Sequence, residues 1–392
     1  MLLVEEVGFR VSDIGKICFV LGTRPEAIKL APVVLVARNR GLDCEVCVTG
    51  QHREMLNQAL GCFDIVPDTN LGIMQHDQTL SNLTVRALSA LTEFFRARNF
   101  DLVLVQGDTT TTFCAALASF YAGIPVGHIE AGLRTGNKHS PYPEEVNRLL
   151  TTRLTDMHFA PTEWARDNLL REAVPGDRVF VTGNTVIDAL HLTVKRVRSF
   201  EPAISELNSA ALDGRRLVLI TSHRREAFGD GIAAICGAVA QLARDFPDVS
   251  FAYTVHKNPN VFGPVHRRLR GLQNVLLLPP VEYLQFVWLL DRCTLVLTDS
   301  GGIQEEAPSL GKPVLVMRET TERPEGLKAG VAKLVGTNQD RITSEAAKLL
   351  DDAIAYKAMA QSTNPYGDGL ASHRIIDACQ RALTKELRSN CA

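Results

Sequence analysis

Charged side chains that could act as acids or bases follow two apolar, strand-like runs in the first half of the chain. Asp108 follows one run and Glu130 ends the next. Taken alone, Asp108 is better interpreted as a cap of the following helix. Adjacent parallel strands, however, would bring Asp108 and Glu130 to one edge of a sheet. Glu144 and Arg148 are four residues apart, so on a helix they share a face, where Arg148 can orient a carboxylate. Carboxylates that converge in this way favour general acid–base catalysis.

A glycine turn with two cations follows the first apolar run. The segment Gly22-Thr23-Arg24-Pro25-Glu26-Ala27-Ile28-Lys29 has a proline at a plausible first helical position. Free amides at a helix N-terminus, together with Arg24 and Lys29, would favour an anion such as phosphate. Neither the P-loop nor the G-x-G-x-x-G spacing is present, so this segment only slightly favours phosphate over a solvated helix start.

The second half of the chain contains two further candidate segments. His223 directly follows a strand-like run and is suited to shuttling protons or contacting phosphate; the alternative is a surface histidine in a basic turn. In the later segment, Ser300 and the amides of Gly301 and Gly302 would form an anion cradle at a helix N-terminus. Glu306, on the first turns of that helix, can accept from ribose hydroxyls. This order of residues favours a nucleoside diphosphate.

The elements that must position these residues alternate between short apolar strands and amphipathic helices, which is the pattern of βα units in a parallel sheet. The pattern restarts midway, so we expect an α/β fold with two doubly wound, Rossmann-like domains. The expected strands are Ile17–Leu21, Cys44–Val48, Leu102–Val105, Val126–Ile129 and His158–Ala160, then Leu217–Thr221, Phe251–Val255, Val275–Leu278, Leu295–Thr298 and Val314–Met317.

The domain boundaries follow from where this pattern is interrupted. Val194–Arg216 lacks a clear apolar strand, and we expect the connection between the domains there or slightly before, around Asp188–Arg216. We therefore predict an N-terminal domain over residues 1–190, a C-terminal domain over 191–370, and a terminal helix over 371–392. The apolar face of that helix is formed by Ile375, Ile376, Cys379 and Leu383.

Composition excludes several other classes of protein. The 392 residues are 45% apolar and 22% charged with a net charge of −2, which excludes disorder and disfavours nucleic acid as a partner. No apolar run approaches the roughly 20 residues of a membrane span, and charges interrupt the N-terminus where a signal peptide would need an apolar stretch. We expect a cytoplasmic protein without membrane insertion.

The cysteines do not indicate a disulfide scaffold or a metal site. There are nine, an odd number spread along a large chain. Cys44 and Cys47 stand three apart in a strand-like run, where they point to opposite faces, and no second cysteine pair accompanies them. A bound nicotinamide would need a dinucleotide fingerprint that the chain lacks, so neither a metal nor a cofactor is predicted.

From about Lys16 to its end, the chain closely resembles the non-hydrolysing UDP-N-acetylglucosamine 2-epimerases. The segments that carry this resemblance are Gly22-Thr23-Arg24-Pro25-Glu26, Thr49-Gly50-Gln51-His52-Arg53-Glu54, Gly107-Asp108-Thr109-Thr110, His128-Ile129-Glu130-Ala131-Gly132-Leu133-Arg134-Thr135-Gly136, His223-Arg224-Arg225-Glu226, Asp299-Ser300-Gly301-Gly302-Ile303-Gln304-Glu305-Glu306 and Thr320-Thr321-Glu322-Arg323-Pro324-Glu325.

The resemblance implies a glycosyltransferase-B-like pair of domains facing each other across a cleft, a C-terminal helix that crosses back to the first domain, and a homodimer. Val281 stands where many relatives have a polar residue, so a side-chain contact to uracil is lost, and Ser222 replaces a smaller residue. The positions that match the catalytic constellation are Asp108, Glu130, Glu144 and His223, with Arg148 alongside. Those that match the substrate and UDP site are Arg24, Lys29, Asp108, Glu130, His223, Phe286, Ser300, Gly301, Gly302, Glu306 and Arg323.

The activity that the resemblance implies is reversible epimerisation at C2 of UDP-N-acetylglucosamine (UDP-GlcNAc) to UDP-N-acetylmannosamine (UDP-ManNAc). UDP would be eliminated to give 2-acetamidoglucal and then added back, and the product would supply ManNAc for bacterial surface polysaccharide. The alternatives are a hydrolysing epimerase that releases ManNAc and UDP, a retaining glycosyltransferase, and a sensor that binds nucleotide sugars without turnover.

The resemblance also suggests regulation. Residues matching Gln51 and His52 bind a second UDP-GlcNAc in bacterial members of the family, and His256 is a candidate partner for that ligand. The alternative is a polar loop that only completes the surface of the domain, and the sequence does not choose between the two. Activation would give rates that are sigmoidal in UDP-GlcNAc.

Overall fold

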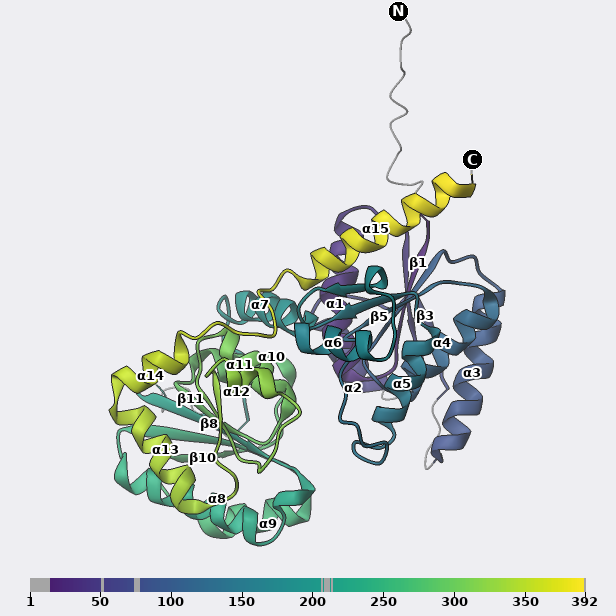
Figure 1. Ribbon diagram of the computed structural model, residues 1–392. Coiled ribbons are helices and arrows are strands. Elements are labelled where there is room, and N and C mark those ends of the chain that lie inside the picture. The colour runs from purple at the N-terminus through teal and green to yellow at the C-terminus, as the bar shows by residue number, and fades with distance from the viewer. Residues whose placement is uncertain are drawn as a thin grey trace, which may run out of the picture. The chain divides into compact units, whose positions relative to one another are not determined.

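The structure is a computed structural model that describes residues 15–50, 53–73, 78–205, 207, 212 and 214–390 (Figure 1). The chain divides into two compact units. Unit 1 comprises Met1–Ala189 and Gly367–Ala392, and unit 2 comprises Leu190–Tyr366. The first unit thus ends at Ala189 rather than at residue 190, and the chain returns to it at Gly367 rather than at residue 371.

Unit 1 is built on a seven-stranded parallel sheet in the order β3-β2-β1-β4-β5-β6-β7. The central strands are fully buried because helices cover both faces, which explains their unbroken apolar sequence. The strands are β1 (Ile17–Leu21), β2 (Cys44–Val48), β3 (Thr69–Asn70), β4 (Leu102–Gln106), β5 (Val126–Ile129), β6 (Met157–Ala160) and β7 (Val179–Val181).

The helices of unit 1 connect these strands and cover the sheet (Figure 1). They are α1 (Arg24–Asn39), α2 (Arg53–Gly61), α3 (Leu80–Arg96), α4 (Thr110–Ala122), α5 (Glu144–Leu154), α6 (Glu163–Arg171), the first part of α7 (Thr185–Val197) and α15 (Ala371–Asn390).

Unit 2 repeats the design with a six-stranded parallel sheet in the order β10-β9-β8-β11-β12-β13. Its strands are β8 (Arg216–Ser222), β9 (Val249–Val255), β10 (Val275–Leu278), β11 (Leu295–Thr298), β12 (Val314–Val316) and β13 (Ala332–Leu334). Its helices are α8 (Asp230–Asp245), α9 (Pro259–Leu269), α10 (Tyr283–Arg292), α11 (Gly301–Ser309), α12 (Pro324–Lys328), α13 (Gln339–Asp351) and α14 (Ala353–Ala360).

The predicted α/β class with two doubly wound parallel sheets is confirmed, and each of the ten expected strands is present to within two residues at either end. In both sheets the order reverses beside the first strand of the unit, which is where ligands bind in folds of this kind. Three edge strands were not predicted, namely β3, β7 and β13. They contain only two or three residues each, too few for an apolar run to stand out.

Helix α7 carries the chain from one unit to the next. Asp188, in the first half of the helix, accepts from the backbone amides of Ala371 and Ser372 in unit 1, at 3.2 and 2.7 Å. Leu190 and Val194, in its second half, belong to the core of unit 2. The chain therefore passes from one unit to the next within a continuous helix. The stretch that was expected to lack a regular pattern begins only after α7 ends at Val197.

The terminal helix α15 packs on α1 of unit 1 (Figure 1). Arg40, which follows α1, contacts Asp377 at 2.5 Å and Gln380 at 2.8 Å. The four apolar residues expected on one face of α15 are all buried. This contact holds α15 against α1.

Candidate functional site

The carboxylate of Glu130 lies at the carboxyl end of β5 and is surrounded by donors. Lys29 from α1 lies with its Nζ 2.5 Å from Oε1, and Asn184 donates to the same oxygen at 3.0 Å. Gln106, at the end of β4, donates to Oε2 at 2.5 Å. The backbone of Glu130 has φ +66°, a left-handed conformation that costs free energy in a residue other than glycine. Such strain is characteristic of functional sites.

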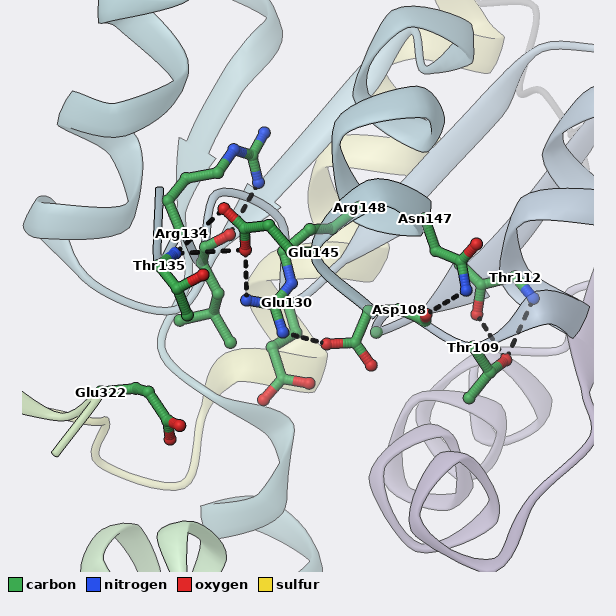
Figure 2. A network of polar contacts seen from close by, with 12 residues as sticks. Asp108, Thr109, Thr112, Glu130, Arg134, Thr135, Glu145, Asn147, Arg148 and Glu322 are labelled. Carbon is green, nitrogen blue, oxygen red and sulfur yellow. Dashed lines mark hydrogen bonds and ion pairs between the residues drawn. The ribbon is translucent and has the colours of Figure 1, made fainter. Parts of the chain in front are cut away.

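Asp108 lies beside this group, held by Arg148 of α5. One guanidinium nitrogen of Arg148 donates to Asp108 Oδ2 at 2.5 Å and another to Glu145 Oε2 at 3.0 Å (Figure 2). Asn147 donates to the backbone carbonyl of Asp108 at 2.9 Å. The Asp108 side chain retains 28% of its exposure, whereas that of Glu145 retains 2%. Asp108 is thus the accessible end of a buried ion-pair chain.

The register of the sheet explains why the two carboxylates meet. Strands β4 and β5 are parallel neighbours with Gln106 opposite Ile129, so the residues that follow them emerge at one edge, as expected from the sequence. The interpretation of Asp108 as a helix cap is wrong, because Thr109 caps α4 by accepting from the amide of Thr112 at 3.2 Å. The side chain of Asp108 is therefore left for other contacts.

A buried histidine fixes the turn that carries Asp108. His128 of β5 lies with its Nε2 2.7 Å from the carbonyl oxygen of Gly107. Burial lowers the pKa of His128 to about 4, so the ring is neutral at pH 7 and Nε2–H donates to this carbonyl. The turn is thereby tied to the neighbouring strand.

Glu26 links the glycine turn that follows β1 to the loop that carries Asp108. Its buried carboxylate accepts from the amides of Gly22 and Thr23, at 3.0 and 2.6 Å, and from the hydroxyls of Thr109 and Thr112, at 2.7 and 3.1 Å. Burial raises its pKa. A Cβ at Gly22 would lie 2.3 Å from the hydroxyl of Thr111, so this position must be glycine.

The structure does not bring all the predicted residues of unit 1 into this network. Arg24 is exposed at the start of α1. Glu144 is partly exposed, and Arg148 pairs with Glu145 rather than with Glu144. Sequence reasoning missed Glu145, although it stands three residues before Arg148, a spacing that also shares a helix face. Gln106 and Asn184 were missed too, and no spacing pattern indicated them.

In unit 2, His223 follows β8 and stacks on a second histidine. The ring centroids of His223 and His256 are 5.9 Å apart, with an interplanar angle of 26°. Nδ1 of His223 lies 3.0 Å from Oδ1 of Asp299, and the His223 side chain is 40% exposed. His256 was predicted to contact a second, regulatory UDP-GlcNAc; Gln51 and His52, predicted to bind the same ligand, lie outside the described residues.

Helix α11 begins at Gly301, at the segment for which the sequence predicted an anion cradle. Ser300 is the N-cap residue, but its side chain forms no capping hydrogen bond. The guanidinium of Arg323 lies over this end of the helix, because a Cβ at Gly301 would be 3.5 Å from its central carbon. Glu305 of the same helix holds Arg323, with Nε 2.6 Å from Oε1. The guanidinium therefore lies close to the backbone at the N-terminus of α11, the positive end of the helix dipole.

The remaining predicted residues of unit 2 surround this helix. Glu306 is buried, and its Oε1 accepts from the hydroxyl of Tyr283 at 3.4 Å. Phe286 of α10 is partly buried against the core of unit 2.

An ion-pair chain links the loop of His223 to that of Arg323. Arg318 contacts Glu226 at 2.6 Å and Glu322 at 3.6 Å, and Glu322 lies 3.5 Å from Arg323. Arg318 is buried, and sequence reasoning did not single it out. These ion pairs connect the loop that carries His223 with the loop that carries Arg323.

Three further findings bound the site. Within the described ranges, no group of three or more His, Cys, Asp or Glu side chains is placed to hold a metal ion. None of the helices in that part of the chain combines the length and apolar character of a membrane span. A cavity of about 890 Å³ in unit 1, lined by residues such as Phe180 and Arg381, contains none of the candidate residues.

Comparisons with known proteins show which family the chain belongs to. A family model described as UDP-N-acetylglucosamine 2-epimerase matches residues 34–380. The UDP-N-acetylglucosamine 2-epimerase of Escherichia coli strain K12 is 54% identical over 367 residues, which cover 93% of this chain and 98% of that protein.

Solved structures are similar over nearly the whole chain. The crystal structure of UDP-GlcNAc 2-epimerase from Neisseria meningitidis bound to UDP-GlcNAc has a TM-score of 0.84 and 48% identity, covering 93% of this chain and 100% of that one. The enzyme from Methanocaldococcus jannaschii in complex with UDP-GlcNAc and UDP has a TM-score of 0.76 and 31% identity, covering 94% and 99%. From the family model and the 54% identical relative, the chain belongs to the UDP-N-acetylglucosamine 2-epimerase family.

Proposed function

We propose that this protein catalyses the reversible epimerisation of UDP-GlcNAc at C2 to give UDP-ManNAc, by elimination and re-addition of UDP. The observation that carries the proposal is the pair of carboxylates Asp108 and Glu130, which follow neighbouring parallel strands. The relatives of this chain are named UDP-N-acetylglucosamine 2-epimerase. Relatives have been solved with UDP-GlcNAc and with UDP.

The chemistry requires a base and an acid but no redox step. The proton at C2 is not next to a carbonyl, so simple abstraction and return is too slow. In the elimination, a base takes the C2 proton while the C1–O bond breaks and its electron pair leaves with UDP, giving 2-acetamidoglucal. In the return step an oxygen of UDP attacks C1 while an acid protonates C2 on the opposite face.

We assign the proton transfers to Asp108, Glu130, Glu144 and His223. The contacts of Asp108 and Glu130 support different electrostatic surroundings for these two acids: Glu130 has three side-chain donors, one of them Lys29, whereas Asp108 has Arg148 and a more exposed side chain. Such a difference is what lets two carboxyl groups serve as acid and base in turn.

We assign UDP to the N-terminus of α11. The amides of Gly301 and Gly302, the hydroxyl of Ser300 and the guanidinium of Arg323 would bind the pyrophosphate, and Glu306 the ribose. Support comes from the position of Arg323 over this helix end. We further assign Arg24 to phosphate, supported by its exposure at the start of α1, and Phe286 to the nucleotide.

An NMR time course on UDP-GlcNAc in D₂O tests the proposal. UDP-ManNAc should build up to an equilibrium with deuterium incorporated at C2 of both sugars. Free ManNAc with UDP would instead identify a hydrolysing epimerase. Absence of turnover until an acceptor is added would identify a glycosyltransferase, and binding without any turnover a sensor. Retention of protium at C2 during epimerisation would argue against the elimination route.

We propose that the protein is a homodimer formed through unit 1. Helices α4 and α5, side by side in Figure 1, carry apolar side chains that are exposed in the single chain, namely Phe120, Tyr121, Leu149 and Leu150. Exposed large apolar side chains gathered on neighbouring helices are typical of an interface. Sedimentation equilibrium, with Phe120→Glu as the variant, tests the assignment.

Two further expectations stay predictions. The first is the cytoplasmic location. The second is activation by a second UDP-GlcNAc, for which initial rates should be sigmoidal in UDP-GlcNAc and the reverse reaction should show a lag that a trace of UDP-GlcNAc removes.

A further inference from the structure

The carboxylate of Asp299 is buried directly behind His223. Asp299 follows β11, which pairs in parallel with β8 so that Thr298 lies opposite Thr221. This register brings Asp299 beside the residues that follow β8. Its Oδ2 accepts from the backbone amides of His223 and Arg224, at 2.7 and 2.8 Å. One oxygen of the carboxylate is therefore used to hold the backbone of the His223 loop.

The other carboxylate oxygen of Asp299, Oδ1, faces the imidazole of His223. Oδ1 of Asp299 is buried and has no hydrogen-bond partner among the described residues, and the nearest candidate donor, Nδ1 of His223, lies 3.0 Å away. Burial acts to raise the pKa of Asp299, but hydrogen bonds and charge from His223 and the two amides outweigh it, so the pKa lies below its usual range. A buried carboxylate oxygen needs a donor, and Nδ1–H of His223 can supply it.

We propose that Asp299 is a positioning residue for His223, which it holds as the Nδ1–H tautomer, leaving Nε2 as the nitrogen that exchanges a proton with the substrate. The inference deepens the proposed function, because it rests on the role of His223 in the reaction. It goes beyond that role by naming the group that fixes the orientation and the reactive atom. A carboxylate behind a catalytic histidine is an effective way to select one tautomer.

The neighbouring histidine provides an internal comparison. Nδ1 of His256 accepts from the backbone amide of Asn258 at 3.1 Å, so this nitrogen carries no proton and Nε2 does. The two stacked rings should therefore carry their protons on opposite nitrogens. Nε2 of His223 is then a hydrogen-bond acceptor, whereas Nε2 of His256 is a donor.

Nitrogen-15 NMR of the unmodified protein tests the tautomer directly. Two-bond proton–nitrogen correlations at alkaline pH, where imidazoles are neutral, should show Nδ1 protonated in His223 and Nε2 protonated in His256. The spectrum of His223→Asn assigns the signals. A protonated Nε2 in His223 would overturn the proposal, and this result does not depend on whether any variant folds.

Kinetics of Asp299→Asn test the consequence. The asparagine oxygen can still accept from the two amides, and its NH₂ then faces Nδ1, which must give up its proton. We expect kcat to fall about 100-fold or more, with KM within a few-fold, because the wrong ring nitrogen is protonated. Asp291→Asn, which removes a carboxylate that pairs with the exposed Arg198, is the matched control and should retain normal kcat.

The double variant separates positioning from stability. If Asp299 acts through His223, Asp299→Asn in a His223→Asn background should cause almost no further loss of kcat. A further loss as large as in the single variant, or normal kcat in Asp299→Asn, would overturn the proposal. Absence of epimerisation by the unmodified protein would instead refute the proposed function, while the tautomer measurement would still decide the placement of the proton.

Discussion

Lys29 and Glu130 stand 101 positions apart in the chain, and the Nζ of one lies 2.5 Å from the Oε1 of the other. Their side chains retain 16% and 6% of their exposure. The pair joins the second turn of α1 to the end of β5, so it links the glycine turn to the strand that carries the strained backbone of Glu130. Lys29, expected to bind phosphate, is thus also the cation that compensates a buried carboxylate.

Removal of the lysine should destabilise unit 1. In Lys29→Met the carboxylate of Glu130 would remain buried without its cation, and we expect the free energy of unfolding to fall by about 3 kcal/mol. Urea denaturation measures this. The double variant Lys29→Met/Glu130→Gln should recover much of the loss, because both charges are then absent. Losses that simply add in the double variant would show that the two side chains are not coupled.

The two carboxylates should be needed for turnover more than for binding. Asp108→Asn and Glu130→Gln should each lower turnover by about 100-fold or more, the usual scale for loss of a general acid or base. We expect UDP affinity to stay within a few-fold, because the contacts to UDP are assigned to other residues, most of them in unit 2. Isothermal titration with UDP and the NMR assay measure the two effects. Near-normal turnover in both variants would refute the catalytic assignment.

Neighbouring residues on α5 offer a matched comparison. Glu145 is buried, pairs with Arg148 and accepts from the amides of Thr135 and Gly136 at distances of 2.9 to 3.1 Å. We expect Glu145→Gln to lower the free energy of unfolding by about 3 kcal/mol, since Arg148 loses a buried partner. Glu144→Gln, at a partly exposed position, should lower turnover without loss of stability. Thermal denaturation measures the stability of both variants. Equal losses of stability would contradict the assignment of a structural role to Glu145 and a catalytic role to Glu144.

Arg323 should contribute mainly to binding. Arg323→Ala removes the guanidinium that lies over the N-terminus of α11, and a pyrophosphate contact is made in the ground state as well as in the transition state. We therefore expect a higher KM for UDP-GlcNAc with a smaller change in kcat. Arg198→Ala, an exposed arginine elsewhere in unit 2, is the control. An unchanged KM would remove Arg323 from the binding site.

Two buried histidines on neighbouring strands should make the protein sensitive to acid. Burial lowers the pKa of His128 to about 4 and that of His158 to about 3, from an ordinary value of 6.5. Between pH 6.5 and 4 the unfolded chain binds a proton at His128 that the folded chain does not, so stability is present above pH 6.5 and is lost as the pH falls.

We expect His128→Asn to reduce the loss of unfolding free energy between pH 6.5 and 4.5 by about 2 to 3 kcal/mol, at 1.4 kcal/mol per pH unit. Urea denaturation at each pH measures the slope, and the exposed His191, changed to Asn, serves as the control. A slope identical to that of the unmodified protein would contradict the burial effect.

Much of the fold could be predicted from local sequence alone. Runs such as Ile17–Leu21 and Leu295–Thr298 are buried on both faces of a parallel sheet, which favours apolar residues almost throughout, and their positions were predicted without error. Glycine at position 22 and at 301 marked the turns after strands because close approach and helix starts favour it there. Helix α15 was predicted from its spacing, which places four apolar residues on one face.

The partners of the polar side chains could not be predicted in the same way. Whether Arg148 pairs with Glu144 or with Glu145 depends on how α5 is rotated against β4, and both spacings share a helix face. Asp299 reaches His223 only because β8 and β11, 76 residues apart at this contact, pair in one register.

The sequence by itself therefore determined the strands, the turns and the residue types that could carry acid–base chemistry, because these depend on local periodicity and on burial. The tertiary structure decided which of these residues are held by which donors, and so which carboxylate is buried in a network and which remains accessible. Register and helix rotation set those contacts to within an ångström, and no pattern along the chain encodes distances of that size.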